Sequence, residues 1–366
     1  MPESGRCVAR SGSGLAFPAK RKALSTGMME FERRSILTAF ALALTTGCAR
    51  ALPSVSDNMM FDPALWRAYK ARFLLPEGRI VDDGNGGVSH SEGQGYGLFL
   101  AQAAGDRTGF DDMARWTRQV LLREDVPLHS WRFVPGQANP VTDTNNATDG
   151  DLLIAWALLM AGRRWGKAEY LEWSAGIRAA IAQKLIVRRH GYSLLLPGLV
   201  GFSKPGKTVI NLSYYVWPAI DAFARIDAHT WSPLSIDGMK IMKAARFGPW
   251  KLPADWLEIK GNGQVEPAEG RDPVFGFEGI RIPLYCLMSG RRIACDAIAR
   301  YWLSLSHSNQ TLPAWINVVT TERAPYGLSA GAGAIAGRLL NRAMPGSGNG
   351  GDYYSATLAL MNQVRL

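Results

Sequence analysis

The amino-acid sequence predicts a mostly helical fold in which paired helices surround a common core. Apolar residues recur every three or four positions along most of the chain, which is the spacing of an amphipathic helix. Clusters of Gly, Pro and Asn end these segments after roughly ten to eighteen residues. Strands do not alternate with the helices as they would around a parallel sheet. The chain has 366 residues, of which 47% are hydrophobic, and this is enough for one large core.

The helical spacing occurs in eleven segments. In chain order they are roughly 61–73, 94–104, 109–122, 150–163, 167–186, 213–227, 234–246, 278–289, 291–306, 326–342 and 352–363. Two runs favour short strands instead, one around 186–196 and one at 316–319, because apolar and β-branched residues are consecutive or alternate there. No Pro- or Ser-rich linker interrupts residues 52–366, so we predict a single domain over that range.

Residues 1–51 are predicted to be an N-terminal extension with an export signal. Two arginines at 33–34 precede an apolar run at 36–44, which is too short to span a bilayer but suits the centre of a signal peptide. The arginine pair also resembles a twin-arginine export motif. We expect cleavage near Ala51, with lipoprotein attachment at Cys48 as the alternative. The mature protein would then be periplasmic or secreted, and a basic tail on a cytosolic protein is the competing interpretation.

Charge and motif spacing exclude several classes of function. The formal net charge is +10, but residues 1–51 carry +5 of it, from eight Lys or Arg against three Glu. The remainder has no basic run, so we expect no nucleic-acid partner. The five His and four Cys show no metal-ligand spacing, so we expect no metal. A GxGxxG match at 346–351 follows a helix near the chain end instead of a strand, so we expect no cofactor.

Three carboxylates lie among glycines and aromatic residues. Glu92 belongs to the segment 91–97 (SEGQGYG), whose three glycines let a ligand or another backbone come close. Asp149 belongs to the segment 147–151 (ATDGD), and Glu278 lies between a Gly-Phe pair and a further Gly. Cleavage of a sugar polymer needs an acid for the leaving oxygen, a base for water and flat rings for the sugar faces. This pattern therefore favours a sugar-cleaving enzyme.

Trp131 is a candidate for stacking on a sugar ring. It follows an apolar stretch at 126–128 and precedes a Gly- and Pro-containing loop and the Asp149 segment. The face of an aromatic ring suits the apolar C–H face of a pyranose. A position at the edge of the core is the alternative.

Five segments resemble family 8 of the glycoside hydrolases and occur in the order seen in that family. They are 91–97 (SEGQGYG), 147–151 (ATDGD), 196–202 (LPGLVGF), 211–214 (NLSY) and 280–283 (IRIP). The resemblance extends from about residue 58 to the end of the chain. It implies an all-α fold, an (α/α)6 barrel with minor short β-strands, and a long groove across one end. It also implies an inverting endo-β-1,4-glucanase that hydrolyses cellulose-type glucan.

The sequence most resembles periplasmic endoglucanases that accompany bacterial cellulose synthases. The resemblance therefore implies a β-1,4-glucan polysaccharide as the substrate and a cellulose synthase complex as a partner in cellulose biosynthesis. We expect the protein to be a monomer.

The resemblance assigns roles to two of the carboxylates. Glu92 would be the general acid and would carry a proton when the substrate arrives. Asp149 would bind sugar hydroxyls at the cleaved residue and hold the distorted ring. The alternative for Glu92 is an ordinary acidic residue in a first helical turn. The alternative for Asp149 is a residue that helps to start a helix.

Four further residues would line the groove. Tyr214 and Arg281 would border the end of the site where water is activated, with a core tyrosine and a structural ion pair as the alternatives. Gln94, beside the acid in the sequence, would contact the substrate. Tyr353 is a further groove candidate.

The sequence departs from the family at one catalytic position. The family usually has Asp where this chain has Glu278, three residues before Arg281, and that residue is the base that activates water. Glu is one methylene longer, which adds about 1.5 Å of reach. A slightly withdrawn backbone would accommodate it, and Phe277 and Gly279 replace the more usual neighbours. Asp272 is a poor substitute because its use would require a rebuilt loop, so we expect activity through Glu278.

The departure at Glu278 leaves alternative functions open. One alternative is a catalytically weakened glucan-binding protein that guides the polymer. Another is the same hydrolysis on chitosan or xylan, because the choice of polysaccharide depends on a few groove side chains.

Overall fold

The computed structural model of the protein describes residues 62–308, 310–343 and 351–366. The predicted leader, with the arginines at 33–34, the cleavage site near Ala51 and Cys48, lies outside these residues. Export and the domain boundary at 51 therefore stay predictions.

Eleven α-helices are present in the described residues, one for each predicted segment. They are α1 (Pro63–Phe73), α2 (Ser91–Ala104), α3 (Arg107–Trp116), α4 (Thr148–Trp165), α5 (Ala168–Lys184), α6 (Trp217–Ala224), α7 (Ala228–Ala244), α8 (Arg281–Met288), α9 (Asp296–His307), α10 (Ala330–Leu340) and α11 (Tyr353–Gln363). Single helical turns form η1 (Asp83–Asn85), η2 (Thr117–Leu121), η3 (Leu212–Tyr214) and η4 (Arg292–Cys295). The predicted mostly helical fold is confirmed.

Several helix starts differ from the predicted bounds, and those of α7 and α2 have a clear physical reason. Helix α7 begins at Ala228 and contains Pro233, whereas the sequence indicated a start after the proline. The side chain of Asp227 accepts a hydrogen bond from the backbone N–H of Thr230 and caps the earlier start. Helix α2 begins at Ser91 and therefore includes the whole glycine-rich segment, which the sequence had placed partly ahead of the helix.

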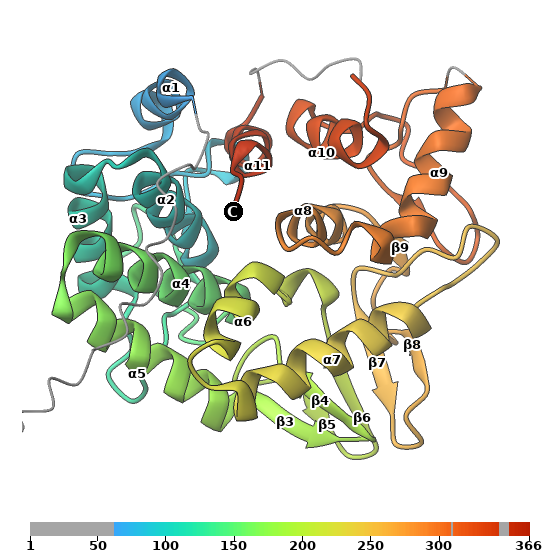
Figure 1. The fold of residues 1–366 in the computed structure, drawn as a ribbon, viewed down its shortest axis with the longest axis horizontal. Helices are drawn as coiled ribbons and strands as arrows, with labels where there is room; N and C mark the ends of the chain where they lie inside the picture. Colours follow the sequence, from blue (N-terminus) through green and yellow to red (C-terminus); the bar gives the residue numbers. More distant parts are fainter. Residues whose placement is uncertain (1–61, 309, 344–350) are drawn as a thin grey trace, which may run out of the picture. The chain divides into compact units, whose positions relative to one another are not determined.

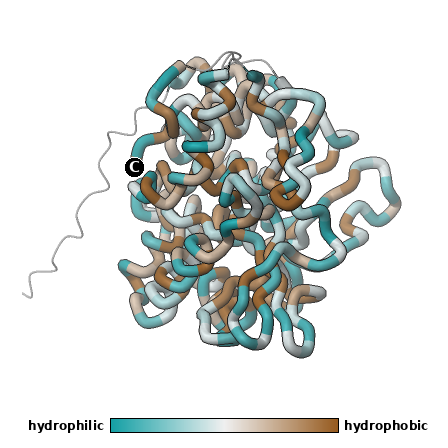
Figure 2. Tube along the Cα trace, turned by 90° about the vertical axis from the view of Figure 1, so that its right-hand side faces the viewer, coloured by the Kyte–Doolittle hydropathy of each residue, from teal (hydrophilic) through white to brown (hydrophobic). Residues whose placement is uncertain are grey.

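The helices are arranged as a ring. In Figure 1, α2, α4, α6, α8 and α11 follow one another around the centre, and α3, α5, α7 and α9 lie outside them. The inner helix α4 is buried on all sides from Thr148 to Gly162, as expected of a helix surrounded by other helices. The outer helix α5 buries only one stripe, which includes Tyr170, Ile177 and Ile181. Figure 2 shows hydrophobic and hydrophilic positions interspersed along the individual helices.

Short antiparallel strands lie at the edges of this ring. They are β1 (Ser89–His90), β2 (Arg132–Phe133), β3 (Ile186–Arg189), β4 (Tyr192–Leu195), β5 (Ser203–Lys204), β6 (Lys207–Ile210), β7 (Leu257–Lys260), β8 (Val265–Pro267), β9 (Val274–Phe275) and β10 (Ile316–Asn317). The β3–β4 hairpin confirms the strands predicted around 186–196, and β10 lies in the run predicted at 316–319. The four-stranded sheet β5-β6-β7-β8 was not predicted, because strands of two to four residues are too short to show a period.

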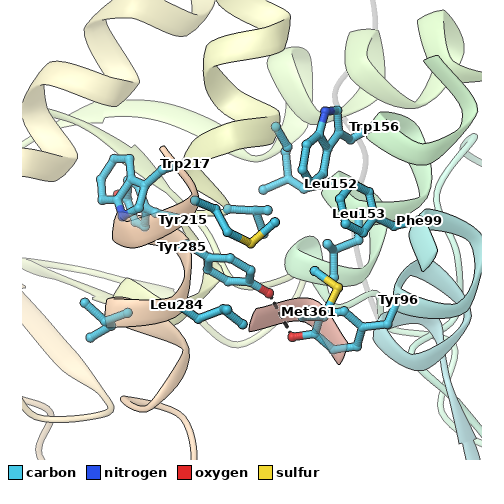
Figure 3. Packing of buried hydrophobic residues seen from close by; sticks show 14 of the residues in the cluster. Tyr96, Phe99, Leu152, Leu153, Trp156, Tyr215, Trp217, Leu284, Tyr285 and Met361 are labelled. Carbon is cyan, nitrogen blue, oxygen red and sulfur yellow. Dashed lines mark hydrogen bonds between the residues drawn. The ribbon is translucent and has the colours of Figure 1, made fainter. Parts of the chain in front are cut away.

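The core lies where the inner helices face one another. Phe99 of α2 stacks on Trp156 of α4, with ring centroids 4.3 Å apart and planes inclined by 22°. The hydroxyl groups of Tyr96 and Tyr285 are 2.8 Å apart, and this hydrogen bond joins α2 to α8 across the centre (Figure 3). Both tyrosines are fully buried, so the bond satisfies polar groups that have no access to water. None of the described helices is long and apolar enough to cross a membrane.

Glycines bring α2 and α4 into backbone contact. A Cβ added at Gly150 would lie 2.3 Å from Ser91 Oγ and 2.6 Å from the backbone nitrogen of Glu92. A Cβ at Gly95 would lie 2.6 Å from Leu153 Cβ. The sequence left open whether a ligand or another backbone approaches these glycines, and at Gly95 and Gly150 the neighbouring helix does so.

We predict that Gly150→Ala destabilises the fold by roughly 1–3 kcal/mol, because the added methyl group has to push α2 away from α4. The free energy of unfolding, measured by urea denaturation, checks this. Gly176→Ala in α5 is the matched control, since the nearest atom to its added Cβ is 3.9 Å away. This control should gain up to about 1 kcal/mol from helix propensity. A Gly150→Ala protein as stable as the wild type would contradict the close contact.

Candidate active site

Three helix N-termini supply the central charged residues. Glu92 is the second residue of α2, Asp149 is the second residue of α4, and Arg281 is the first residue of α8. Glu278 lies in the turn that leads into α8, and the backbone N–H of Arg281 donates to its carbonyl oxygen at 3.2 Å. The positive end of a helix dipole favours a carboxylate in the first turn, so the fold suits Glu92 and Asp149 where they stand.

Arg281 connects all three predicted carboxylates. Its Nη1 contacts Glu92 Oε1 and lies 2.8 Å from Asp149 Oδ2, and its Nη2 contacts Glu278 Oε2. The arginine side chain is 4% exposed, so these bonds form in a site largely shielded from water. Glu92 and Glu278 therefore contact different nitrogens of one planar guanidinium group.

Glu92 has a second partner on its own helix. The hydroxyl group of Tyr96, four residues further along α2, donates to Glu92 Oε1 at 3.1 Å. Residues four apart lie on the same helix face, so this contact follows from the local sequence. The Glu92 side chain keeps 23% of its surface exposed, which leaves its carboxyl group open to a ligand.

Glu278 is held by neutral donors as well as by Arg281. Asn211 Nδ2 donates to Glu278 Oε2 at 3.1 Å, and Ser213 Oγ lies 3.2 Å from the same oxygen. Burial raises the pKa of Glu278, and the negative charges of Asp149 and Asp255 raise it further. A carboxylate with a raised pKa is a stronger base toward water than an ordinary glutamate.

Asp149 is fixed by a loop that packs on the start of α4. Thr148 Oγ1 donates to the carbonyl oxygen of Leu196 at 2.7 Å, and the backbone N–H of Thr148 donates to that of Pro197 at 2.9 Å. Asn146 Oδ1 accepts from the backbone N–H of Leu199 at 2.8 Å. Asp149 is 2% exposed, and this burial raises the pKa of its carboxyl group.

Trp131 and Tyr214 each lie close to one part of this charged site. The carbonyl oxygen of Trp131 accepts from the backbone N–H of Ser91, so the tryptophan lies beside the residue before Glu92. Its ring is partly exposed and stacks on His90, with centroids 5.9 Å apart. The ring of Tyr214 lies 5.6 Å from the guanidinium carbon of Arg281. Both placements suit the predicted substrate contacts, which stay predictions.

Gln94 and Tyr353 need correction as groove residues. The Gln94 side chain is fully buried, with Oε1 accepting from the backbone N–H of Ile80 and Nε2 donating to Gly78 and Thr117. Its amide therefore supports the fold beneath the site and has no donor left for a sugar. Tyr353 is 4% exposed and packs edge-on against Phe73, with ring centroids 5.9 Å apart, so it belongs to the core.

The structure adds site residues that sequence reasoning missed. Tyr354, next to Tyr353, is the member of the pair near the site, and its hydroxyl group donates to the carbonyl oxygen of Phe277 at 2.8 Å. Tyr96 and Asn211 lie inside the recognised segments 91–97 and 211–214, and this position was the signal that could have identified them. Asp255 bonds the turn that carries Glu278, yet it is 23 residues away in sequence and lies in no motif.

Comparison with known proteins gives the family. The family model described as glycosyl hydrolases family 8 matches residues 37–365. A probable endoglucanase from Novacetimonas hansenii is 40% identical over 304 residues, which cover 81% of this chain and 88% of the relative. An endoglucanase from Cellulomonas uda is 40% identical over 271 residues, which cover 74% of this chain and 75% of the relative.

Solved structures agree with this assignment. An endo-β-1,4-glucanase from Acetobacter xylinum has a TM-score of 0.77 and 38% identity, covering 82% of this chain and 96% of its own. An endoglucanase from Klebsiella pneumoniae has a TM-score of 0.76 and 37% identity, and the match covers 82% of this chain and 97% of the Klebsiella chain. These similarities confirm the predicted (α/α)6 barrel with minor short strands, and with the family model they establish that this chain belongs to family 8 of the glycosyl hydrolases.

Proposed function

We propose that the protein is an inverting endo-β-1,4-glucanase in which Glu92 is the general acid and Glu278 is the general base. The observation that carries the proposal is the attachment of these two carboxylates to different nitrogens of Arg281. Inverting glycosidases use one carboxyl group as the acid and a second as the base, with a water molecule between the base and the sugar, and Arg281 brings two carboxyl groups to one site. The relatives called endoglucanases support a glucan as the substrate, and the solved endo-β-1,4-glucanase from Acetobacter xylinum supports the β-1,4 linkage.

The proposed reaction balances with these groups alone. The Glu92 carboxyl group gives its proton to the glycosidic oxygen as the bond from that oxygen to C1 breaks. Glu278 takes a proton from water, and the water oxygen forms the new bond to C1 from the opposite face. Arg281 Nη1 then stabilises the carboxylate that Glu92 becomes, in the ion pair that the structure contains.

Asp149 and the aromatic residues complete the proposed substrate contacts. Asp149 would bind a hydroxyl group of the sugar at the cleaved bond, and its attachment to Arg281 keeps it beside the reacting carbon. Trp131 would stack on a sugar ring next to the acid, and Tyr214 would border the base.

The biological setting is part of the same proposal. Export to the periplasm or the medium, a monomeric state and work beside a cellulose synthase complex are supported by the leader sequence and by the resemblance described above.

Glu92→Gln should lower kcat on carboxymethylcellulose by at least about 100-fold, because the amide has the shape of the acid but no proton to give. Reducing-end release and viscosity loss measure this. Glu172→Gln, an exposed residue of α5, is the matched control and should keep wild-type activity. Near-wild-type turnover by Glu92→Gln would remove Glu92 from the acid role. A wild-type protein that binds the polymer without cutting it would favour the glucan-binding alternative.

The stereochemistry of the product tests the inverting mechanism separately. Attack of water opposite the leaving oxygen converts a β linkage into an α-configured reducing end. Proton NMR during the first minutes of cello-oligosaccharide hydrolysis should therefore show the α anomer before mutarotation. Initial formation of the β anomer would contradict the assignment of Glu278 as a base that activates water.

Glu278→Asp should lower kcat by roughly 10- to 100-fold, although Asp is the more usual residue of the family. The shorter side chain withdraws the carboxylate by about 1.5 Å from Asn211, Ser213 and Arg281, and misplacement on this scale is costly. Kinetics on carboxymethylcellulose check this. A gain of activity by Glu278→Asp over an inert wild type would show that the longer residue had weakened an ancestral enzyme.

A further inference from the structure

A buried carboxylate lies behind the turn that carries the proposed base. We call residues 276–279 the base turn. Asp255 Oδ1 accepts hydrogen bonds from the backbone N–H groups of Gly276 at 2.8 Å and Gly279 at 2.9 Å. Asp255 Oδ2 accepts from the N–H of Glu278 itself at 3.3 Å. One side chain therefore fixes three of the four backbone N–H groups of the base turn.

The two glycines of the base turn make this close approach possible. A Cβ at Gly279 would lie 2.7 Å from Asp255 Oδ1 and 2.6 Å from the Phe275 ring. A Cβ at Gly276 would lie 2.8 Å from Trp315 Cβ. The turn can rest on Asp255 because Gly279 lacks a side chain, and it can pack on Trp315 because Gly276 lacks one.

The burial and the hydrogen bonds of Asp255 indicate a positioning role. It is 5% exposed, its carboxylate accepts hydrogen bonds from the backbone of this turn, and its own N–H donates to the carbonyl oxygen of Val274 at 2.7 Å. A buried carboxylate bonded by neutral donors instead of a cation is expensive, and burial raises the pKa of Asp255 to about 6. The three N–H groups that aim at its two oxygens offset part of this cost, because the ionised form accepts at both oxygens.

We propose that Asp255 is a positioning residue that draws the base turn back, so that the longer side chain of Glu278 places its carboxylate on Asn211, Ser213 and Arg281. This inference rests on the proposed function, because it assigns Asp255 a role in placing the base. The backbone of Glu278 bonds to Asp255 while its side chain reaches Arg281, so the turn lies between them. Loss of Asp255 should release the turn and move the base.

The first experiment compares Asp255→Asn with a matched control. Asp237→Asn removes another carboxylate that accepts a backbone N–H, from Ser193 at 2.9 Å, away from the three carboxylates. On carboxymethylcellulose, Asp255→Asn should lower kcat by roughly 10- to 100-fold with KM within about twofold, and Asp237→Asn should leave both within about twofold. Equal losses in kcat for the two variants, or unchanged kcat for Asp255→Asn, would overturn the proposal.

The pH profile provides a readout that a merely structural role would not move. Glu278 faces Asp149, Arg281, Tyr214, Tyr285 and Tyr354 as well as Asp255. Removal of the Asp255 charge lowers the pKa of Glu278 and leaves the other neighbours in place. The base is then ionised at lower pH, so the acid limb of kcat/KM should move to lower pH in Asp255→Asn. An unmoved acid limb would count against the proposal.

A second pair of variants keeps the test decisive if Asp255→Asn does not fold. Gly279→Ala places a methyl group against Asp255 and should push the base turn toward Arg281, with a loss of kcat of about 10-fold or more. The shorter Glu278→Asp should then restore part of this loss, although it lowers kcat in the wild type. A double variant no faster than Gly279→Ala alone would contradict the proposal.

The proposed function and this inference fail in distinguishable ways. If the wild type is inert on carboxymethylcellulose, or if Glu92→Gln retains its rate, the proposed function fails. If the wild type is active and Glu92→Gln is inactive, but Asp255→Asn behaves like Asp237→Asn, only the role of Asp255 fails.

Discussion

The guanidinium group of Arg281 is the interaction on which the rest of the site depends. It bonds Glu92 from α2, Asp149 from α4 and Glu278 from the turn before α8. Three carboxylates around one cation would repel one another in open water, and they persist because their helices are packed too closely to separate. The contact between α2 and α4 at Gly95 and Gly150 is therefore a requirement of the charges as well as of the core. Because three carboxylates share one cation, the excess of negative charge favours a proton on one of them, and an acid–base mechanism needs such a proton.

Much of this arrangement was predictable from local sequence. All eleven helices follow from apolar spacing, and the carboxylates stood out because glycines and rings surround them. Tyr353 was predicted at the groove, whereas Tyr354 is the tyrosine near the site, because neighbouring residues of a helix point about 100° apart. Gln94 was wrongly predicted to face the groove. The sequence does not show whether an amide next to an acidic residue faces a groove or bonds the backbone, as Gln94 does at Ile80. The role of Asp255 could not be predicted from the sequence, because its partners lie 21 to 24 residues away in the chain.

The Glu at the position of the proposed base, where the family usually has Asp, is best understood together with its neighbours. A longer side chain is compatible with the same chemistry if the backbone that carries it lies further from the sugar. In this chain Asp255 bonds the backbone of Glu278 and Gly279, so a residue 23 positions away in the sequence forms one geometric unit with that turn.

The placement of helix α11 has a consequence for the order in which the enzyme folds. Helix α11 closes the ring against the first elements: Thr357 bonds Tyr69, Tyr353 bonds Asp83, and the neighbouring Tyr354 bonds the turn that carries Glu278. Contacts between residues nearly 290 positions apart form late, because a long loop has to close first. Catalytic competence should therefore arise only after the ribosome has released almost the entire chain. A nascent polypeptide would carry its acid and base long before they could act together.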